Sequence, residues 1–93
     1  MGRGGIVIGD NVLIGPNCNI MTTNHPVDKT LRKGTISKEI IIENNVWLGA
    51  NVTVTPGVVI GENSIIGAGS VVTKNIPKNV IAAGIPAKVI KEI

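Results

Sequence analysis

The chain has 93 residues, and its composition favours strands and tight turns over helices. Ile supplies 16 residues, Val 12, Gly 12 and Asn 10, whereas Phe and Tyr are absent and Trp47 is the only aromatic residue. β-Branched side chains pack well on a pleated surface, and Gly and Asn accept tight turns at low cost. With 43% apolar and 16% charged residues, the chain is not expected to be disordered.

The net charge of +3 is mild, and it limits the partners that can be expected. The basic residues form no dense run and base-stacking aromatics are missing, so we expect no nucleic-acid partner and favour a small phosphorylated ligand. No apolar run approaches ~18 residues, and residues 1–5 lack the apolar stretch of a signal peptide. We therefore expect a cytoplasmic chain with no membrane partner.

A period of six residues runs through two blocks of the chain, residues 8–25 and 42–77. Each repeat starts with a large aliphatic residue, here called the lead residue. Four positions later comes a residue that we expect to point inward, and an Asn or Gly directly precedes most of these inward residues. The lead residues are Ile8, Ile14, Ile20, Ile42, Leu48, Val54, Ile60, Ile66 and Val72. The Asn and Gly positions are Asn11, Asn17, Asn45, Asn51, Gly57, Asn63, Gly69 and Asn75.

This period is typical of a solenoid built from hexapeptide coils. Residues six apart lie about 240° apart on an α-helix, and a coiled coil needs a period of seven, so neither helical structure fits. Each repeat supplies one short strand and one corner, at which Asn or Gly takes the left-handed conformation. Three repeats return the chain to its start, one strand spacing (~4.8 Å) further along the axis. Because such a short prism leaves aliphatic faces uncovered, we expect a homotrimer around a threefold axis.

Residues 26–41 and 78–93 depart from the repeat, and we treat all 93 residues as a single domain. The polar stretch 26–41 is expected to be a loop extruded from a corner, a common place for function. Residues 78–93 are expected to be a C-terminal packing arm, with a short helix after Pro86. Cys18 occupies an inward position, which favours core packing over chemistry. His25, the only histidine, stands at the mouth of the loop.

The hexads, together with Asn24-His25-Pro26-Val27-Asp28, resemble the hexapeptide-repeat acyltransferases, in particular the C-terminal half of the maltose and galactoside O-acetyltransferases. The resemblance implies an all-β fold, the left-handed parallel β-helix, whose hand the spacing alone does not give. It further implies transfer of an acetyl group from acetyl-CoA to a sugar hydroxyl, with no metal and with His25 as the general base. An imidazole of pKa ~6.5 suits proton removal at neutral pH.

The same resemblance implies the residues that hold coenzyme A. The segment 44–50 is similar to a family segment beside the active site, so Trp47 is expected to line the pocket. Backbone N–H groups near Gly49 and Ala50 are expected to meet the thioester oxygen. Ala68 is implied as a backbone contact, and Thr73 with Lys74 and the tail residues Lys88 and Lys91 as contacts to the nucleotide end. The implied cofactor residues are Trp47, Gly49, Ala50, Ala68, Thr73, Lys74, Lys88 and Lys91.

Two other functions stay open at this point. Family members are about twice this length. Part of the site that binds their acceptor sugar lies toward the N-terminal side of the segment present here, and it includes an acidic residue at the position that matches Arg3. The chain can therefore also be an inactive or truncated scaffold that binds coenzyme A or partners without catalysis. The zinc carbonic anhydrases share the fold but need three histidine ligands for each metal, and this chain has one histidine.

Overall fold

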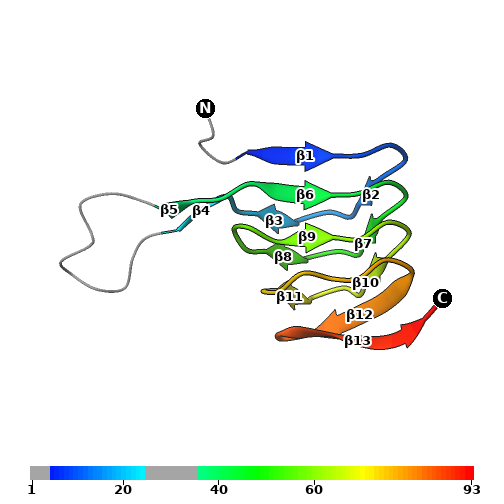
Figure 1. The fold of residues 1–93 in the computed structure, drawn as a ribbon. Coiled ribbons are helices and arrows are strands. Elements are labelled where there is room, and N and C mark those ends of the chain that lie inside the picture. The colour runs from blue at the N-terminus through cyan, green and yellow to red at the C-terminus, as the bar shows by residue number, and fades with distance from the viewer. Residues whose placement is uncertain (1–4, 25–35) are drawn as a thin grey trace.

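The computed structural model describes residues 5–24 and 36–93, and this part of the chain consists of strands, turns and loops without a helix (Figure 1). The long axis of the solenoid runs from β1 at one end to the β12–β13 hairpin at the other. The strands are β1 (Ile6–Ile8), β2 (Leu13–Ile14), β3 (Asn19–Ile20), β4 (Thr23–Asn24), β5 (Ile36–Ser37), β6 (Ile40–Ile42), β7 (Trp47–Leu48), β8 (Thr53–Val54), β9 (Val59–Ile60), β10 (Ile65–Ile66), β11 (Val71–Val72), β12 (Val80–Gly84) and β13 (Ala87–Glu92).

Three sheets form the walls of a triangular prism, so the chain is a parallel β-helix. Wall A consists of β1, β6 and β9, wall B of β2, β7, β10, β12 and β13, and wall C of β3, β8 and β11. All pairs within the walls are parallel except β12–β13. The lead residues lie in register from coil to coil, as in the column Ile14–Leu48–Ile66 of wall B. The period of six therefore predicted the coil correctly.

The core is the column of lead and inward residues inside the prism. Lead residues of the second and third coils, such as Leu48 and Ile66, have no exposed surface. In the first coil, Ile8 and Ile14 occupy the same inward position but are 46% and 40% exposed. The reason is that β1, β2 and β3 are the outermost strands of their walls in the described part of the chain.

The corners follow the Asn and Gly pattern with one exception. Seven of the eight predicted positions have positive φ, and Asn75 does not; Asn79, which was not predicted, also has positive φ, at 58°. Ile76, which bridges to Ile60 on wall A, comes four positions after Val72 instead of six. Asn79 then follows Ile76 at the same offset at which Asn63 follows Ile60. The repeat thus continues into a fourth coil after losing two residues, and this deletion hid it in the sequence.

The C-terminal arm is a β-hairpin, and the short helix expected after Pro86 is wrong. Residues 87–92 form β13, which pairs antiparallel with β12, and β12 in turn pairs with β10 of wall B. The arm therefore extends wall B, and the backbone N–H and C=O groups of β12 and β13 form hydrogen bonds within that sheet. Ile85, Val89, Ile90 and Ile93 are all exposed, and Val89 and Ile90 break the strand alternation because the register shifts opposite Ile81 and Ala82.

The extruded segment begins and ends with an antiparallel pair. β4 pairs with β5, so the chain leaves the prism where wall C meets wall A and returns to the same edge (Figure 1). β6 of wall A starts at Ile40, so the loop ends two residues earlier than the expected end at residue 41. Residues 25–35, which include His25, lie outside the described residues.

The close stacking of coils predicts that Gly49→Ala destabilises the fold. A Cβ at Gly49 would lie 2.8 Å from the backbone nitrogen of Ala68 in the next coil, so one of the two coils would have to shift. We expect a loss of about 1–3 kcal/mol in the free energy of unfolding. Gly5→Ala is the matched control, since a Cβ there meets nothing within 4 Å. Equal unfolding midpoints for the two variants in urea would contradict this account.

Candidate functional site

Gly49, Ala50 and Ala68 gather at one vertical edge of the prism, where wall B turns into wall C (the B/C edge). Gly69 N–H donates to the Ala50 carbonyl at 2.8 Å, which places the two corners one above the other. Gly49 N–H donates to the Ile66 carbonyl at 2.9 Å and is therefore not available to a thioester oxygen. Ala50 N–H makes no backbone hydrogen bond within residues 5–24 and 36–93, so it is the better candidate of the two.

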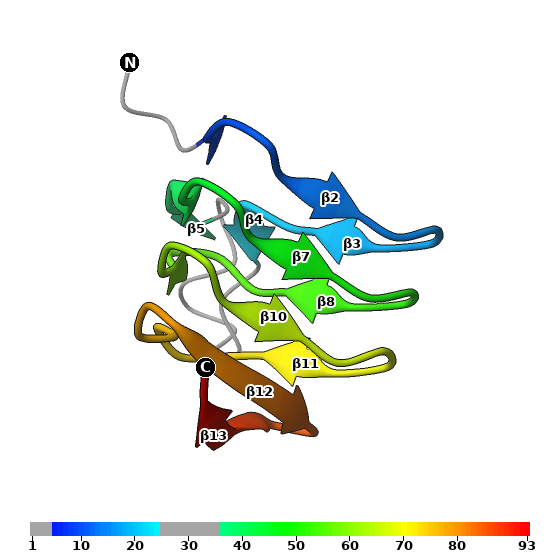
Figure 2. The same cartoon turned by 90° about the vertical axis from the view of Figure 1, so that its right-hand side faces the viewer.

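Trp47 lies on the outer face of wall B and is 52% exposed, because it directly precedes the inward lead residue Leu48 on the strand. Its neighbours in register are Leu13 above and Ile65 below, and Ile81 continues the row on β12. Trp47 therefore belongs to a ladder of outward apolar residues, two positions before the B/C edge. Figure 2 looks onto this part of the molecule, with β2, β7, β10 and β12 stacked one below the other.

Lys88 and Lys91 share a face with Trp47 because of a bulge. Both are exposed and lie on β13, where Lys88 pairs with Ala83 and Lys91 with Ile81. The register shifts between Ile81 and Ala82, so the three-residue interval between the lysines matches a two-residue interval on β12. Residues two apart on a strand lie on one face, and Ile81 is on the outer face of wall B. The two ammonium groups are thus carried on the outer face.

Thr73 and Lys74 lie at a different edge, where wall C turns toward wall A (the C/A edge). Both are exposed and directly follow β11. The corner above them is held by Thr55, whose hydroxyl donates to the Val72 carbonyl at 3.0 Å. The β4–β5 hairpin leaves the prism at the same edge, two coils higher. Thr73 and Lys74 therefore share an edge with the base of the segment that carries His25.

The predicted site residues form two groups in one chain, with wall C between them. The first group comprises Trp47, Gly49, Ala50, Ala68, Lys88 and Lys91, on wall B and the B/C edge. The second comprises Thr73, Lys74 and the hairpin base at the C/A edge. His25 and Arg3 fall outside the described residues, so their positions in the site remain predictions.

Cys18 packs as expected. Its side chain is half-buried against the core, and its thiol donates to the Gly49 carbonyl at 3.2 Å. The described residues hold no group of three or more metal-ligating side chains, and none of them forms a helix long and apolar enough to cross a membrane.

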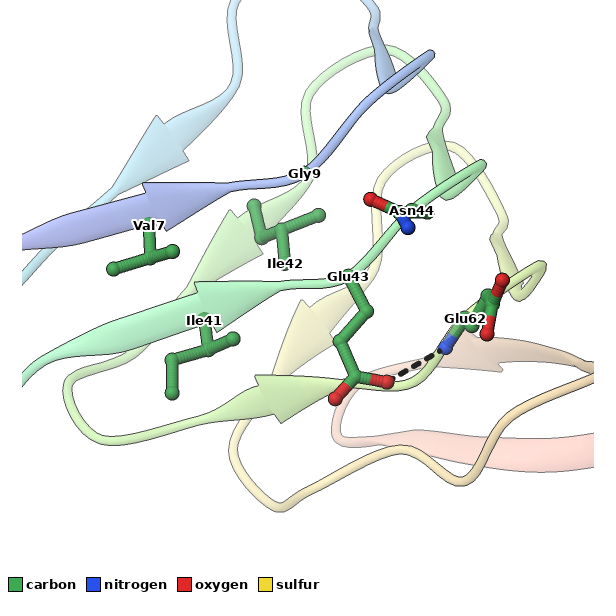
Figure 3. Close-up of a pocket in the computed structure, with 7 residues that line it drawn as sticks. All are labelled: Val7, Gly9, Ile41, Ile42, Glu43, Asn44 and Glu62. Carbon is green, nitrogen blue, oxygen red and sulfur yellow. Dashed lines mark hydrogen bonds between the residues drawn. The ribbon is translucent and has the colours of Figure 1, made fainter.

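Sequence reasoning missed a groove of about 350 Å³ on the outside of wall A (Figure 3). Its polar side chains hold neighbouring coils together: Glu43 Oε1 accepts from Glu62 N–H at 3.1 Å, and Asn44 Oδ1 accepts from Asp10 N–H at 2.7 Å. Val7 and Ile41 supply its apolar part. No motif marks these residues, because they are ordinary corner and outward positions of the repeat.

Comparison with known proteins identifies the class. The family model described as "Bacterial transferase hexapeptide (six repeats)" matches residues 39–74, and that described as "Hexapeptide repeat of succinyl-transferase" matches residues 5–24. The chain belongs to the hexapeptide-repeat acyltransferase family, and its fold is the left-handed parallel β-helix of that family.

Within the family, the chain is similar to galactoside O-acetyltransferases. It is 58% identical to that of Escherichia coli (strain K12) over 90 residues, and 54% identical to that of Lactococcus lactis; these alignments cover 95% of this chain and 44% of each relative. A galactoside acetyltransferase in complex with coenzyme A superimposes with a TM-score of 0.91 at 58% identity, and a maltose O-acetyltransferase from Clostridium difficile with 0.91 at 51%. These alignments cover 95% of this chain and 45% and 48% of the two structures. The chain thus spans less than half of the relatives and matches their C-terminal part.

Proposed function

We propose that the protein transfers an acetyl group from acetyl-CoA to a hydroxyl group of a sugar. The observation that carries the proposal is the close likeness to a galactoside acetyltransferase in complex with coenzyme A, at 58% identity and a TM-score of 0.91. A second relative, a hexapeptide-repeat acetyltransferase of Vibrio cholerae complexed with acetyl-CoA, superimposes with a TM-score of 0.90 at 42% identity over 94% of this chain.

His25 acts as the general base in the proposed reaction. Neutral imidazole takes the proton of the acceptor hydroxyl while its oxygen attacks the thioester carbonyl carbon. The carbon–sulfur bond then breaks, the acetyl ester forms, and coenzyme A leaves as a thiol after receiving the proton. Ala50 N–H is the donor proposed for the carbonyl oxygen as it becomes negative. No covalent acyl-enzyme is needed, in agreement with the packing role of Cys18.

The lysines serve the anionic end of the cofactor. Because the bulge of β13 carries Lys88 and Lys91 on one face, both ammonium groups can act on one phosphorylated ligand. Lys74 supplies a third exposed cation at the C/A edge, beside the hydroxyl of Thr73.

We further infer a homotrimer whose sites lie between subunits. Walls A and B carry outward apolar ladders, Val7–Ile41–Val59 and Leu13–Trp47–Ile65, whereas wall C begins with the polar pair Asn19 and Thr53. Packing wall A of one chain on wall B of the next buries both ladders and closes a ring. If the edges between walls A and B lie at the axis, the C/A edge of one chain approaches the B/C edge of its neighbour. The two groups of site residues then meet.

The second candidate is a scaffold that binds coenzyme A without catalysis. It is supported by the length of the chain, which covers 44% of the galactoside O-acetyltransferases that it resembles. For either function we infer a cytoplasmic location, since the single cysteine is free, as is usual in a reducing compartment.

A thiol-release assay separates the two functions. Acetyl-CoA is offered with maltose, glucose or galactosides, and coenzyme A binding is measured by calorimetry on the same protein. For the enzyme, we expect turnover with at least one sugar, a rate about 10²–10⁴ lower for His25→Ala, and coenzyme A affinity within a few-fold of the native value in that variant. Tight binding of coenzyme A without turnover on any sugar would support the scaffold instead. Native turnover in His25→Ala would remove His25 from the mechanism.

The placement of the tail lysines predicts the effect of charge removal. Lys88→Ala and Lys91→Ala should each weaken coenzyme A binding by about three- to tenfold, because each removes one exposed cation from the outer face of wall B. Lys78→Ala is the control, since Lys78 is also exposed but lies on the edge between walls A and B, away from both groups of site residues. Because that edge is placed at the trimer axis, light scattering must show that Lys78→Ala keeps the native mass. An equal effect of all three substitutions would mean that only the overall charge matters.

A shared site predicts complementation between two inactive variants. His25→Ala removes the base at one edge, and Trp47→Ala removes the aromatic wall at the other. Co-refolded in equal amounts, the two should regain about a quarter of native activity, because a site is intact when each neighbour supplies its native half. Mixed trimers are verified by native mass spectrometry. Mixed trimers without recovered activity would place both residues in one subunit's site.

A further inference from the structure

Two serine side chains lie inside the prism at inward positions of the third coil, where the second coil has valines. Ser64 is 0% and Ser70 1% exposed, and Val46 and Val52 occupy the equivalent places one coil above. A hydroxyl buried without a hydrogen-bond partner destabilises a fold, so each serine has to find its partners inside the prism. Those partners show which segments the two hydroxyls hold together.

The hydroxyl of Ser70 joins two segments that are distant in sequence. It donates to the Gly67 carbonyl at 2.7 Å and accepts from the Gly84 N–H at 3.1 Å. Gly67 belongs to the corner at the B/C edge that contains Ala68, and its own N–H donates to the Ala82 carbonyl at 2.9 Å. Gly84 is the last residue of β12, which lies below β10 and β11 in Figure 2. One buried hydroxyl therefore ties this corner of the third coil to the point where β12 turns into β13.

The turn that Ser70 holds leads directly to Lys88. Gly84 pairs with Ala87 across the hairpin, so two residues form the turn, and Lys88 is the next residue of β13. A turn this short fixes the register of its two strands, so the place of Lys88 follows from that of Gly84. Gly84 has a φ of 111°, which favours glycine, and it therefore has no side chain with which to anchor the turn. The anchor comes from Ser70 instead.

We propose that Ser70 is a positioning residue for coenzyme A, because it sets Lys88 relative to the backbone of Ala68. The proposal rests on the proposed function, in which these two residues contact one cofactor. A lysine on a loosely held strand loses more freedom when it binds a phosphate than one on a fixed strand, and it binds more weakly for that reason. With 1% of its surface exposed, Ser70 acts only through the backbone groups that it holds.

Ser64 offers a matched control at the other end of β12. Its hydroxyl donates to the Pro77 carbonyl at 2.6 Å and accepts from the N–H of Val80, the first residue of the strand, at 3.3 Å. Val80 and Gly84 are four residues apart, roughly 13 Å along a strand. The backbone carbonyls of both serines accept an N–H group from the coil above. Removal of either hydroxyl thus breaks the same kind of bonds in the same coil, but only Ser70 holds the hairpin turn.

Calorimetry with coenzyme A compares the native protein with Ser70→Ala and Ser64→Ala. We expect the Kd to rise about three- to tenfold in Ser70→Ala and to stay within about twofold of the native value in Ser64→Ala. Ser70→Thr should keep the native Kd, because threonine retains the hydroxyl and has the shape of Val52, one coil above. In a Lys88→Ala background, Ser70→Ala should change the Kd by less than about twofold, since Ser70 acts through Lys88. Equal weakening by the two serine variants would overturn the proposal, and so would additive effects of Ser70→Ala and Lys88→Ala.

Amide hydrogen exchange separates a failure of this proposal from a failure of the proposed function, because it needs no cofactor. The Gly84 N–H should exchange at least about tenfold faster in Ser70→Ala than in the native protein, and the Val80 N–H should do so in Ser64→Ala. Unchanged exchange at Gly84 in Ser70→Ala would overturn the proposal even if the native protein binds coenzyme A. Absence of coenzyme A binding by the native protein would overturn the proposed function, and with it the role of Lys88, whatever the exchange at Gly84.

Discussion

The stacking of one coil on the next through backbone hydrogen bonds is the constraint on which the rest of the structure depends. It requires a corner at every sixth residue, and the left-handed conformation at Asn45, Asn51 and Asn63 turns the chain while the same residue donates its N–H to the coil above. Positive φ costs little for Asn and Gly and more for other residues. Because each coil fixes the register of the next, the two-residue deletion between Val72 and Ile76 shortens one corner while Ile76 stays in register with Ile60.

The sequence predicts the walls well because one face of every strand is buried. A shift of one residue would expose a lead residue such as Leu48 or Ile66, so the period of six is visible without any other information. The prediction failed where two residues are missing from a corner. Asn75 was assigned a left-handed corner after Val72, and the left-handed corner at Asn79, after Ile76, was missed. A fixed period cannot register a shortened corner when Ile76 and Val80 are both aliphatic.

The geometry of the candidate site was harder to predict from the sequence than the walls, because it depends on pairing between segments that are distant in the chain. Sequence spacing alone places Lys88 and Lys91 on opposite faces of a strand, and only the bulge opposite Ile81 and Ala82 brings them to one face. Similarly, the occupied N–H of Gly49 becomes apparent only when Ile66 is seen one coil below. The division of the site between two edges also requires the topology, since Ala68 and Thr73 are five residues apart in sequence and lie at different edges.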